Sequence, residues 1–283
     1  MIPGPFESFI AVDWSGAKSG YQKKLTVARC TKGTQAPELI APEAGWSRQG
    51  IADFIAAQSA GTLTGFDFSF APPFLDRGTY LPGENVPEEG PAFWHLVEDV
   101  CIADADCGAH SFVEKAYRHH FYLGKADGTK SDYMRWRTCE TVFNARGGGK
   151  AACVFDAIGA AQVSKASFAG MRALQRLAKE VPIWPFMTPQ PGASAVVEIY
   201  CRAFIRLSGL RGLKIRDIDT LNAALAAFDS EPVEYADPLS DDETDVLVTA
   251  AGLRALAENP AAWSPEGLSA KVAKTEGWTF GVF

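Results

Sequence analysis

The segment Phe9-Ile-Ala-Val-Asp13-Trp-Ser-Gly16 decides how the start of the chain folds. A run of apolar, partly β-branched residues that ends at turn-forming residues is typical of a buried β-strand. Asp13 would then lie at the tip of this strand, where a buried carboxylate is costly unless a cation or a hydrogen-bond donor meets it. The segment therefore predicts a polar site at one edge of a sheet.

A second segment repeats this design. Residues 63–70 form an apolar run that carries Asp67 near its end, just before Pro72 and Pro73. If the two strands are neighbours, Asp13 and Asp67 lie side by side and can share a divalent metal ion. The alternative is that each acid only begins a turn, which is a common role of aspartate.

The order of the elements around these two segments indicates the fold class. Residues 24–30 alternate as a strand does, and Lys32-Gly33 separates them from a short return strand at 38–41. Ser47 is the expected N-cap of a helix that Gly61 ends. The strand at 63–70 follows that helix, so a right-handed crossover should make it parallel to the first strand.

This order, with three antiparallel strands, a helix and a parallel strand, is the opening order of the ribonuclease H-like fold. We therefore expect an α/β protein with a mixed five-stranded sheet flanked by helices. A single domain should span residues 1–283. Prolines and glycines break residues 72–191 into short helices and loops, which predicts a long insertion. Residues 167–178 should form a helix, and residues 195–200 a further strand that contains Glu198.

A late helix supplies two more acids. Ser240 and Glu243 have the spacing of a capping box at its start. At about 100° per residue, Asp242 falls within the apolar stripe of this helix and Asp245 on its flank. Charges in the first turn complement the helix dipole, which accounts for Asp242 in part. Asp245 lies beyond the first turn, so the dipole explains it poorly and a site role is favoured.

The inward or strand-tip acids form one candidate metal centre. Oxygen ligands of this type suit Mg²⁺ or Mn²⁺, and two such ions can support phosphodiester cleavage. Glu198 has alternatives, since it can lie at an edge or pair with Arg202. The expected catalytic residues are Asp13, Asp67 and Asp245. The expected metal ligands are Asp13, Asp67, Glu198, Asp242 and Asp245.

Composition limits the function classes. The net charge of -7 argues against a non-specific nucleic-acid binder with a broad basic surface. Charge is nevertheless uneven, since residues 115–150 carry a net +5 and residues 229–245 hold eight acids and no base. The six cysteines show no paired C-x-x-C spacing, and no apolar stretch has the length of a membrane span. We expect reduced thiols, no membrane partner and a cytoplasmic location; the oligomeric state stays open.

Histidine offers weaker signals. His95, Cys101, Cys107 and His110 match no common zinc spacing. His119 and its neighbour His120 belong to the basic segment and are expected at the surface.

Several motifs in this order resemble the predicted-nuclease family known as domain of unknown function 429. They include Ala11-Val-Asp13-Trp-Ser-Gly16, Gly65-Phe-Asp67, Arg137-Thr-Cys-Glu140, Val154-Phe-Asp-Ala-Ile-Gly159, Val197-Glu198-Ile-Tyr200, Asp242-Glu-Thr-Asp245 and the terminal Glu276-Gly-Trp-Thr-Phe-Gly281. The resemblance covers nearly the whole chain and implies a ribonuclease H-like fold with a nuclease-like acidic centre. Cys201 follows Tyr200 where the family more often has proline.

The resemblance implies a metal-dependent nuclease or phosphodiesterase that acts on nucleic acid or another phosphate ester. Two other classes stay open. Asp13-Trp-Ser-Gly16 also matches the first turn of actin-like ATPases and sugar kinases, although the chain is short for two lobes. A catalytically dormant binding protein is the third class. Arg137 can contact a phosphate or form an internal ion pair with Glu140, and the internal pair is favoured.

Overall fold

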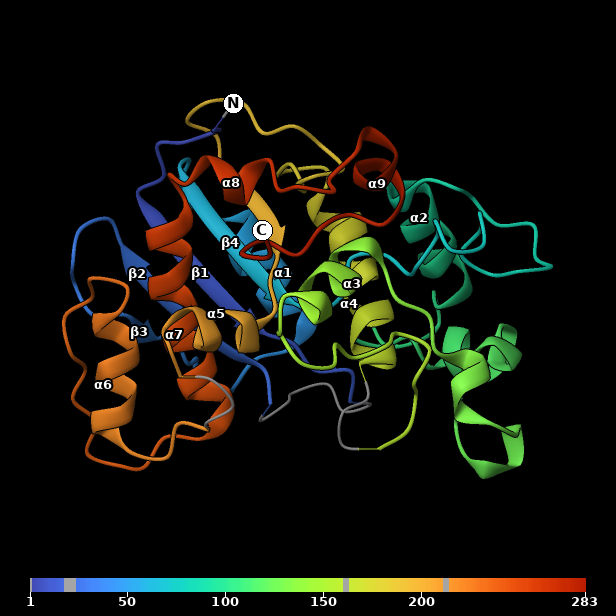
Figure 1. The fold of residues 1–283 in the computed structure, drawn as a ribbon, viewed down its shortest axis with the longest axis horizontal. Coiled ribbons are helices and arrows are strands. Elements are labelled where there is room, and N and C mark those ends of the chain that lie inside the picture. The colour runs from blue at the N-terminus through green and yellow to red at the C-terminus, as the bar shows by residue number, and fades with distance from the viewer. Residues whose placement is uncertain (1, 18–23, 160–162, 211–213) are drawn as a thin grey trace.

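The structure is a computed structural model that describes residues 2–17, 24–159, 163–210 and 214–283. A five-stranded sheet with the order β3-β2-β1-β4-β5 forms its centre (Figure 1). β1 pairs antiparallel with β2, and β2 antiparallel with β3, whereas β4 runs parallel to β1 and to β5. The expected mixed sheet is therefore confirmed. The strands are β1 (Ser8–Asp13), β2 (Thr26–Thr31), β3 (Glu38–Leu39), β4 (Thr62–Asp67) and β5 (Ala195–Glu198).

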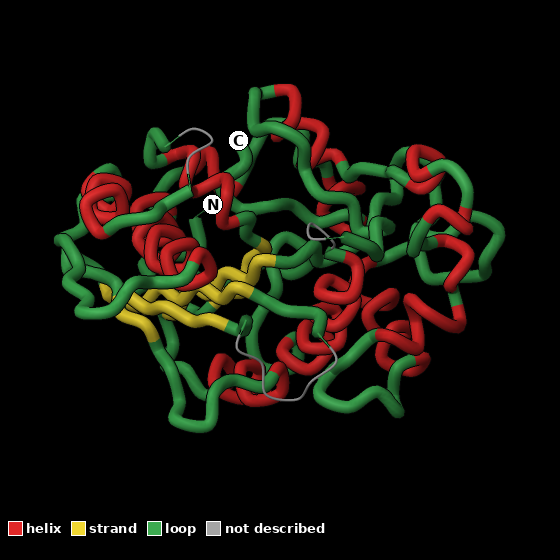
Figure 2. Tube along the Cα trace, turned by 90° about the horizontal axis from the view of Figure 1, so that it is seen from below, coloured by secondary structure: helices red, strands yellow, loops and turns green. Residues whose placement is uncertain are grey.

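Helices cover both faces of the sheet, as Figure 2 shows. The helices are α1 (Arg48–Ala56), α2 (Gly90–Val100), α3 (Thr138–Ala145), α4 (Ser164–Leu177), α5 (Cys201–Leu207), α6 (Ile218–Ala226), α7 (Asp241–Leu256), α8 (Pro260–Trp263) and α9 (Ala270–Thr275). Four short helical turns lie between α2 and α3: η1 (Phe112–Ala116), η2 (Arg118–His120), η3 (Lys125–Asp127) and η4 (Lys130–Tyr133).

The alternation of side chains along β1 divides the core between the two faces. Ile10 and Val12 join one apolar cluster with residues of α1, α2 and α4. Phe9 and Ala11 join the other with residues of α5, α6 and α7. Because side chains alternate along a strand, Asp13 lies on the same face as Phe9 and Ala11, which is the face that α7 covers.

Helix α7 lies close against the sheet because small residues stand at the contact. A Cβ atom added to Gly65 of β4 would lie 2.6 Å from a methyl group of Ile199 and 3.0 Å from Leu253 of α7. A Cβ atom at Gly252 of α7 would lie 2.4 Å from the ring of Phe204 in α5. All three distances are shorter than normal contacts of a Cβ atom, so glycine at these two positions permits the close packing of α5, α7 and β4.

The predicted caps are confirmed, and some predicted boundaries were wrong. Ser47 caps α1 by accepting a hydrogen bond from the amide of Gly50, but the helix ends at Ala56 rather than running to Gly61. The strand predicted over residues 63–70 ends at Asp67. It ends there because the chain turns, with the amide of Phe68 donating to the carbonyl of Phe66 at 3.1 Å.

The segment predicted as an insertion, 72–191, packs onto the central layers. It supplies α2, α3 and α4, and α4 buries Phe168, Met171 and Leu174 in the cluster on the α1 face of the sheet. All six cysteines lie in the described part of the chain, where each is buried and has a free thiol. Among the described helices, none has the length and apolar character needed to cross a membrane.

Candidate metal centre

Asp13 and Asp67 stand side by side at the ends of two parallel strands. In the pairing of β1 with β4, Asp13 is directly opposite Asp67. Neighbouring strands lie about 4.8 Å apart, and opposed residues of a parallel pair point to the same face. The two carboxylates therefore share the face that α7 covers, as the sequence predicts.

Helix α7 adds two carboxylates to this pair. Its capping box is confirmed, since the Ser240 hydroxyl accepts from the amide of Glu243 and the Glu243 carboxylate accepts from the Ser240 amide. The cap fixes the start of the helix, and Asp242 and Asp245 follow within its first two turns. Both are partly buried, and both act electrostatically on Asp13.

Burial and repulsion between neighbouring carboxylates raise the pKa values of the acids in this group. Burial raises the pKa of Asp13 to about 9, and nearby carboxylates strengthen this shift. Burial and the charges of Asp67 and Asp242 raise the pKa of Asp245 to about 7. The pKa of Asp242 is also raised, mainly by burial, although Lys24 opposes the shift. Without a cation, Asp13 therefore favours its protonated form near neutral pH.

Hydrogen bonds stabilise the charged form of Asp67, and its pKa is raised less than that of Asp13. Burial raises its pKa to about 6, while hydrogen bonds from Cys201 limit the rise. The Cys201 amide donates to Oδ2 of Asp67 at 3.3 Å. The pKa of the Cys201 thiol is in turn raised by burial and by the charges of Asp67 and Asp13. Cys201 was not among the site residues predicted from the sequence, because a single buried cysteine carries no local signal of its own.

Basic side chains surround the acids at the openings of the site. Asp13 and Asp242 line one cavity together with Lys24 and Lys165. Asp245 lines another, to which α5 and the segment before α6 contribute basic residues. These are Arg202, Arg206 and Lys214. Sequence analysis missed these cations because they come from separate segments and form no run, and they lie outside the basic segment 115–150.

Glu198 belongs to a different arrangement. Its oxygens accept from Nη2 and Nη1 of Arg137 at 2.6 and 2.7 Å, and also from the Phe70 amide and the Thr279 hydroxyl. This bonding occupies both oxygens, so it does not support the predicted role of Glu198 as a metal ligand. Its partner is Arg137, not Arg202.

Arg137 also pairs internally with Glu140, as predicted. Its Nε donates to Oε1 of Glu140 at 2.9 Å, and its amide donates to the other oxygen at 2.8 Å. Both side chains are almost fully buried. Burial raises the pKa of Glu140, and the Arg137 guanidinium opposes that shift. Arg137 thus ties α3 to β5 and is not free to contact a phosphate.

Carboxylate oxygens are suitable ligands for a hard cation, but the oxygens of the aspartates are too far apart to bind one ion together as they stand. Among the described residues, the group of three or more potential ligands whose donor atoms all lie within 4.8 Å is Glu84, His119 and His120. Asp13, Asp67 and Asp245 do not meet this distance. If all three bind one ion at the usual distance of about 2.1 Å, at least one side chain must rotate.

The other histidines have local partners. Nε2 of His110 lies 2.7 Å from Asp104, and Nδ1 of His95 lies 3.1 Å from the amide nitrogen of Gln175. Cys101 and Cys107 do not join them in a metal-ligating group within the described chain.

Comparisons of the chain with protein-family models, with curated proteins and with solved structures find no match. The likeness to the domain-of-unknown-function-429 nucleases therefore stays a prediction from the sequence motifs. What this chain can do follows from its own residues.

Proposed function

We propose that this protein is a metal-dependent phosphodiesterase with a ribonuclease H-like fold, and that Asp13, Asp67 and Asp245 hold Mg²⁺ or Mn²⁺. The observation that carries the proposal is the direct opposition of Asp13 and Asp67 on parallel strands beneath a helix that adds Asp245. The neighbouring side chains that raise the pKa of Asp13 are all acids. A divalent cation would remove this repulsion.

The strand order supports the fold assignment. A sheet of order β3-β2-β1-β4-β5, antiparallel over the first three strands and then parallel, has the arrangement expected of a ribonuclease H-like core. Such sheets present ligands at the carboxyl ends of their parallel strands. Asp13 and Asp67 are the last residues of β1 and β4.

In this proposal, the aspartates would bind the metal and the nearby cationic side chains would bind the substrate. If Mg²⁺ or Mn²⁺ were bound here, the chemistry it would supply is activation of water and stabilisation of the leaving oxygen of a phosphodiester. Asp13 and Asp67 would hold such an ion between two strands, and Asp245 would complete the ligands from α7. Lys24 and Arg202 border the openings and would pair with substrate phosphates, whereas Lys165 already pairs with Glu114 at 2.6 Å. Glu198 is left out because Arg137 already neutralises it.

The test is metal-dependent cleavage by matched variants. Single-stranded DNA, RNA and a small phosphodiester are incubated with the protein and Mn²⁺. Asp13→Asn and Asp67→Asn should each lower the rate by at least about 100-fold, because loss of a direct ligand should exceed the 10- to 100-fold effects of changes around a metal. Asp53→Asn is the control, since Asp53 is exposed on α1 and forms an exposed pair with Arg176.

Circular dichroism should confirm that each variant keeps its fold. Undiminished cleavage by folded Asp13→Asn protein would overturn the proposal.

Metal binding separates this function from the two other classes. At a free Mn²⁺ concentration of 100 times Kd, binding should stabilise the protein by about 2.7 kcal/mol, and Asp67→Asn should abolish the effect. Stabilisation that requires ATP as well as metal would instead favour phosphotransfer. If millimolar Mn²⁺ causes no thermal shift and no heat of binding, the dormant binding protein is favoured.

A further inference from the structure

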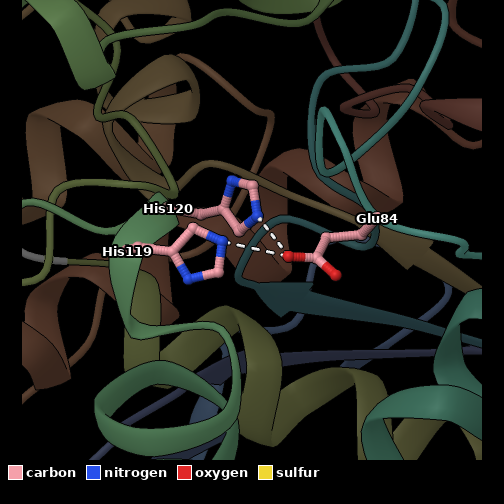
Figure 3. A group of neighbouring side chains, drawn as sticks. All are labelled: Glu84, His119 and His120. Carbon is pink, nitrogen blue, oxygen red and sulfur yellow. Dashed lines mark hydrogen bonds and ion pairs between the residues drawn. The ribbon is translucent and has the colours of Figure 1, made fainter.

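The side chains of Glu84, His119 and His120 point toward one another (Figure 3). Oε1 of Glu84 lies 3.0 Å from Nε2 of His119 and 3.4 Å from Nε2 of His120. The two imidazole rings lie together, with centroids 4.1 Å apart. The three donor atoms all fall within 4.8 Å of one another.

These separations match those of ligands around one small cation. Zinc binds histidine nitrogen and carboxylate oxygen at about 2.0–2.2 Å, usually with tetrahedral geometry. Two ligands of such a tetrahedron are about 3.3–3.6 Å apart, as follows from those bond lengths. The distances from Glu84 to the two histidines are close to this range, so only small side-chain movements are needed.

The fold holds the ligands in place from two sides. Glu84 lies in a turn that is closed by its amide donating to the carbonyl of Leu81 at 3.1 Å. Arg135 fastens the chain before this turn, since it donates to the carbonyls of Tyr80 and Thr79 and pairs with Asp76 through two bonds. A site built on secured backbone loses less entropy when it binds a metal.

The histidines lie on η2, which follows a buried aromatic layer. Phe112 is fully buried and contacts the ring of Tyr117, directly before η2. His120 has only 12% of its side chain exposed, whereas His119 has 64% exposed. Burial and the neighbouring His119 lower the pKa of His120, although Glu84 opposes this shift.

The site has an open side. His119 and His120 line a cavity together with Arg77, Asp132 and Tyr133. Three protein ligands would leave a fourth position on a tetrahedral ion, and the cavity exposes both histidines to solvent. In zinc sites, an open fourth position usually holds water.

We propose that Glu84, His119 and His120 form a binding site for a divalent transition metal of the zinc class, with water as the fourth ligand. Imidazole nitrogen favours zinc and related ions over Mg²⁺ and Mn²⁺, whereas the aspartate centre offers only oxygen. The two sites should therefore select different metals. The proposal rests only on these three side chains and does not depend on the proposed phosphodiesterase activity.

The test is calorimetric titration of the whole protein with Zn²⁺, together with the visible absorption of bound Co²⁺. Wild-type protein should bind one equivalent at this site and show the intense absorption of four-coordinate Co²⁺. Glu84→Gln, His119→Ala and His120→Ala should each lower the affinity by at least about 100-fold, more than changes around a metal usually do. His95→Ala is the matched control and should bind as wild type does.

Two further variants keep the test decisive. His119→Ala removes an exposed side chain, so its loss of binding cannot be ascribed to unfolding. Asp13→Asn should retain the Zn²⁺ equivalent, which separates this site from the aspartate centre. The proposal is overturned if wild-type protein binds no Zn²⁺ at micromolar concentrations, or if His119→Ala and Glu84→Gln bind it unchanged.

Discussion

This protein has two groups of acids in largely buried positions, and the two groups differ in how their negative charge is neutralised. Around Arg137, the carboxylates of Glu198 and Glu140 meet a guanidinium and several hydrogen-bond donors. At the ends of β1 and β4, Asp13 and Asp67 meet each other and the acids of α7. In the first group, a guanidinium of the same chain neutralises the acids. The described residues provide no such ion pair for Asp13 or Asp67.

We interpret this difference as separating acids that serve structure from acids that are proposed to bind a metal. A buried charge without a partner is costly, so a chain that keeps several such acids together stores repulsion in its metal-free fold. The pKa of Asp13, raised to about 9, is the consequence. The Arg137 network shows that this fold supplies an internal cation where the acids serve only structure.

The largest effect is expected from removing the internal cation. Arg137→Met leaves Glu198 and Glu140 buried without their partner, which should lower the free energy of unfolding by about 3–5 kcal/mol. Chemical denaturation measures the loss. Arg29→Met breaks an exposed pair with Glu38 and should cost less than about 1 kcal/mol. Equal effects of the two variants would remove the contrast between buried and exposed pairs.

The second prediction concerns the metal-free aspartate centre and pH. The folded-state pKa of Asp13 is raised above the ordinary value of 3.8, so between about pH 4 and 9 the folded state binds more protons than the unfolded state. The free energy of unfolding should therefore fall as pH rises through this window. The slope is up to about 1.4 kcal/mol per pH unit for each such acid.

Denaturation at several pH values in a chelator measures this slope. Asp13→Asn should flatten it, whereas Asp53→Asn on the exposed face of α1 should leave it unchanged. A slope that is the same in Asp13→Asn and wild type would show that the pKa of Asp13 is not raised in the folded protein. Saturating Mn²⁺ should also flatten the wild-type slope, because the ion favours the charged carboxylates.

The smallest effect is expected at the cap of α7. Ser240→Ala removes the hydroxyl that accepts from the Glu243 amide at 3.2 Å and should cost about 1 kcal/mol. It should also weaken Mn²⁺ binding, because Asp242 and Asp245 follow this cap. Ser269→Ala removes an equivalent cap from α9 at a similar cost. If both variants bind Mn²⁺ equally well, the start of α7 does not position the metal ligands.

The elements that sequence predicted best are those with strong local signals. The apolar run into Asp13, the Ser47 cap and the Ser240 capping box are each set by residues close together in the chain. The end of β4 was predicted too far along because Phe68 and Phe70 continue the apolar pattern. Their backbone instead turns, and the Phe70 amide donates to Glu198, a partner 128 residues away.

In the candidate site as well, features with a local signal were predicted from the sequence, whereas contacts between distant segments were not. Strand-tip position and helical periodicity were enough to select Asp13, Asp67 and Asp245, because both follow from the local repeat of the backbone. The same reasoning selected Glu198, since an acid inside an apolar strand has the same local pattern. Its pairing with Arg137 depends on how α3 packs against β5. Lys24 and Lys165 were missed because isolated cations carry no local signal, and Arg202 was considered only as a partner of Glu198.

The sequence by itself determined the strands, the caps and the positions of the acids, because hydrophobic period and capping act over a few residues. The tertiary structure alone decided which acids are neutralised and which are left facing one another. It also brought Glu84 to His119 and His120 across 35 residues of chain. Charges and ligands act through distances in space, and those distances are fixed only when the helices pack onto the sheet.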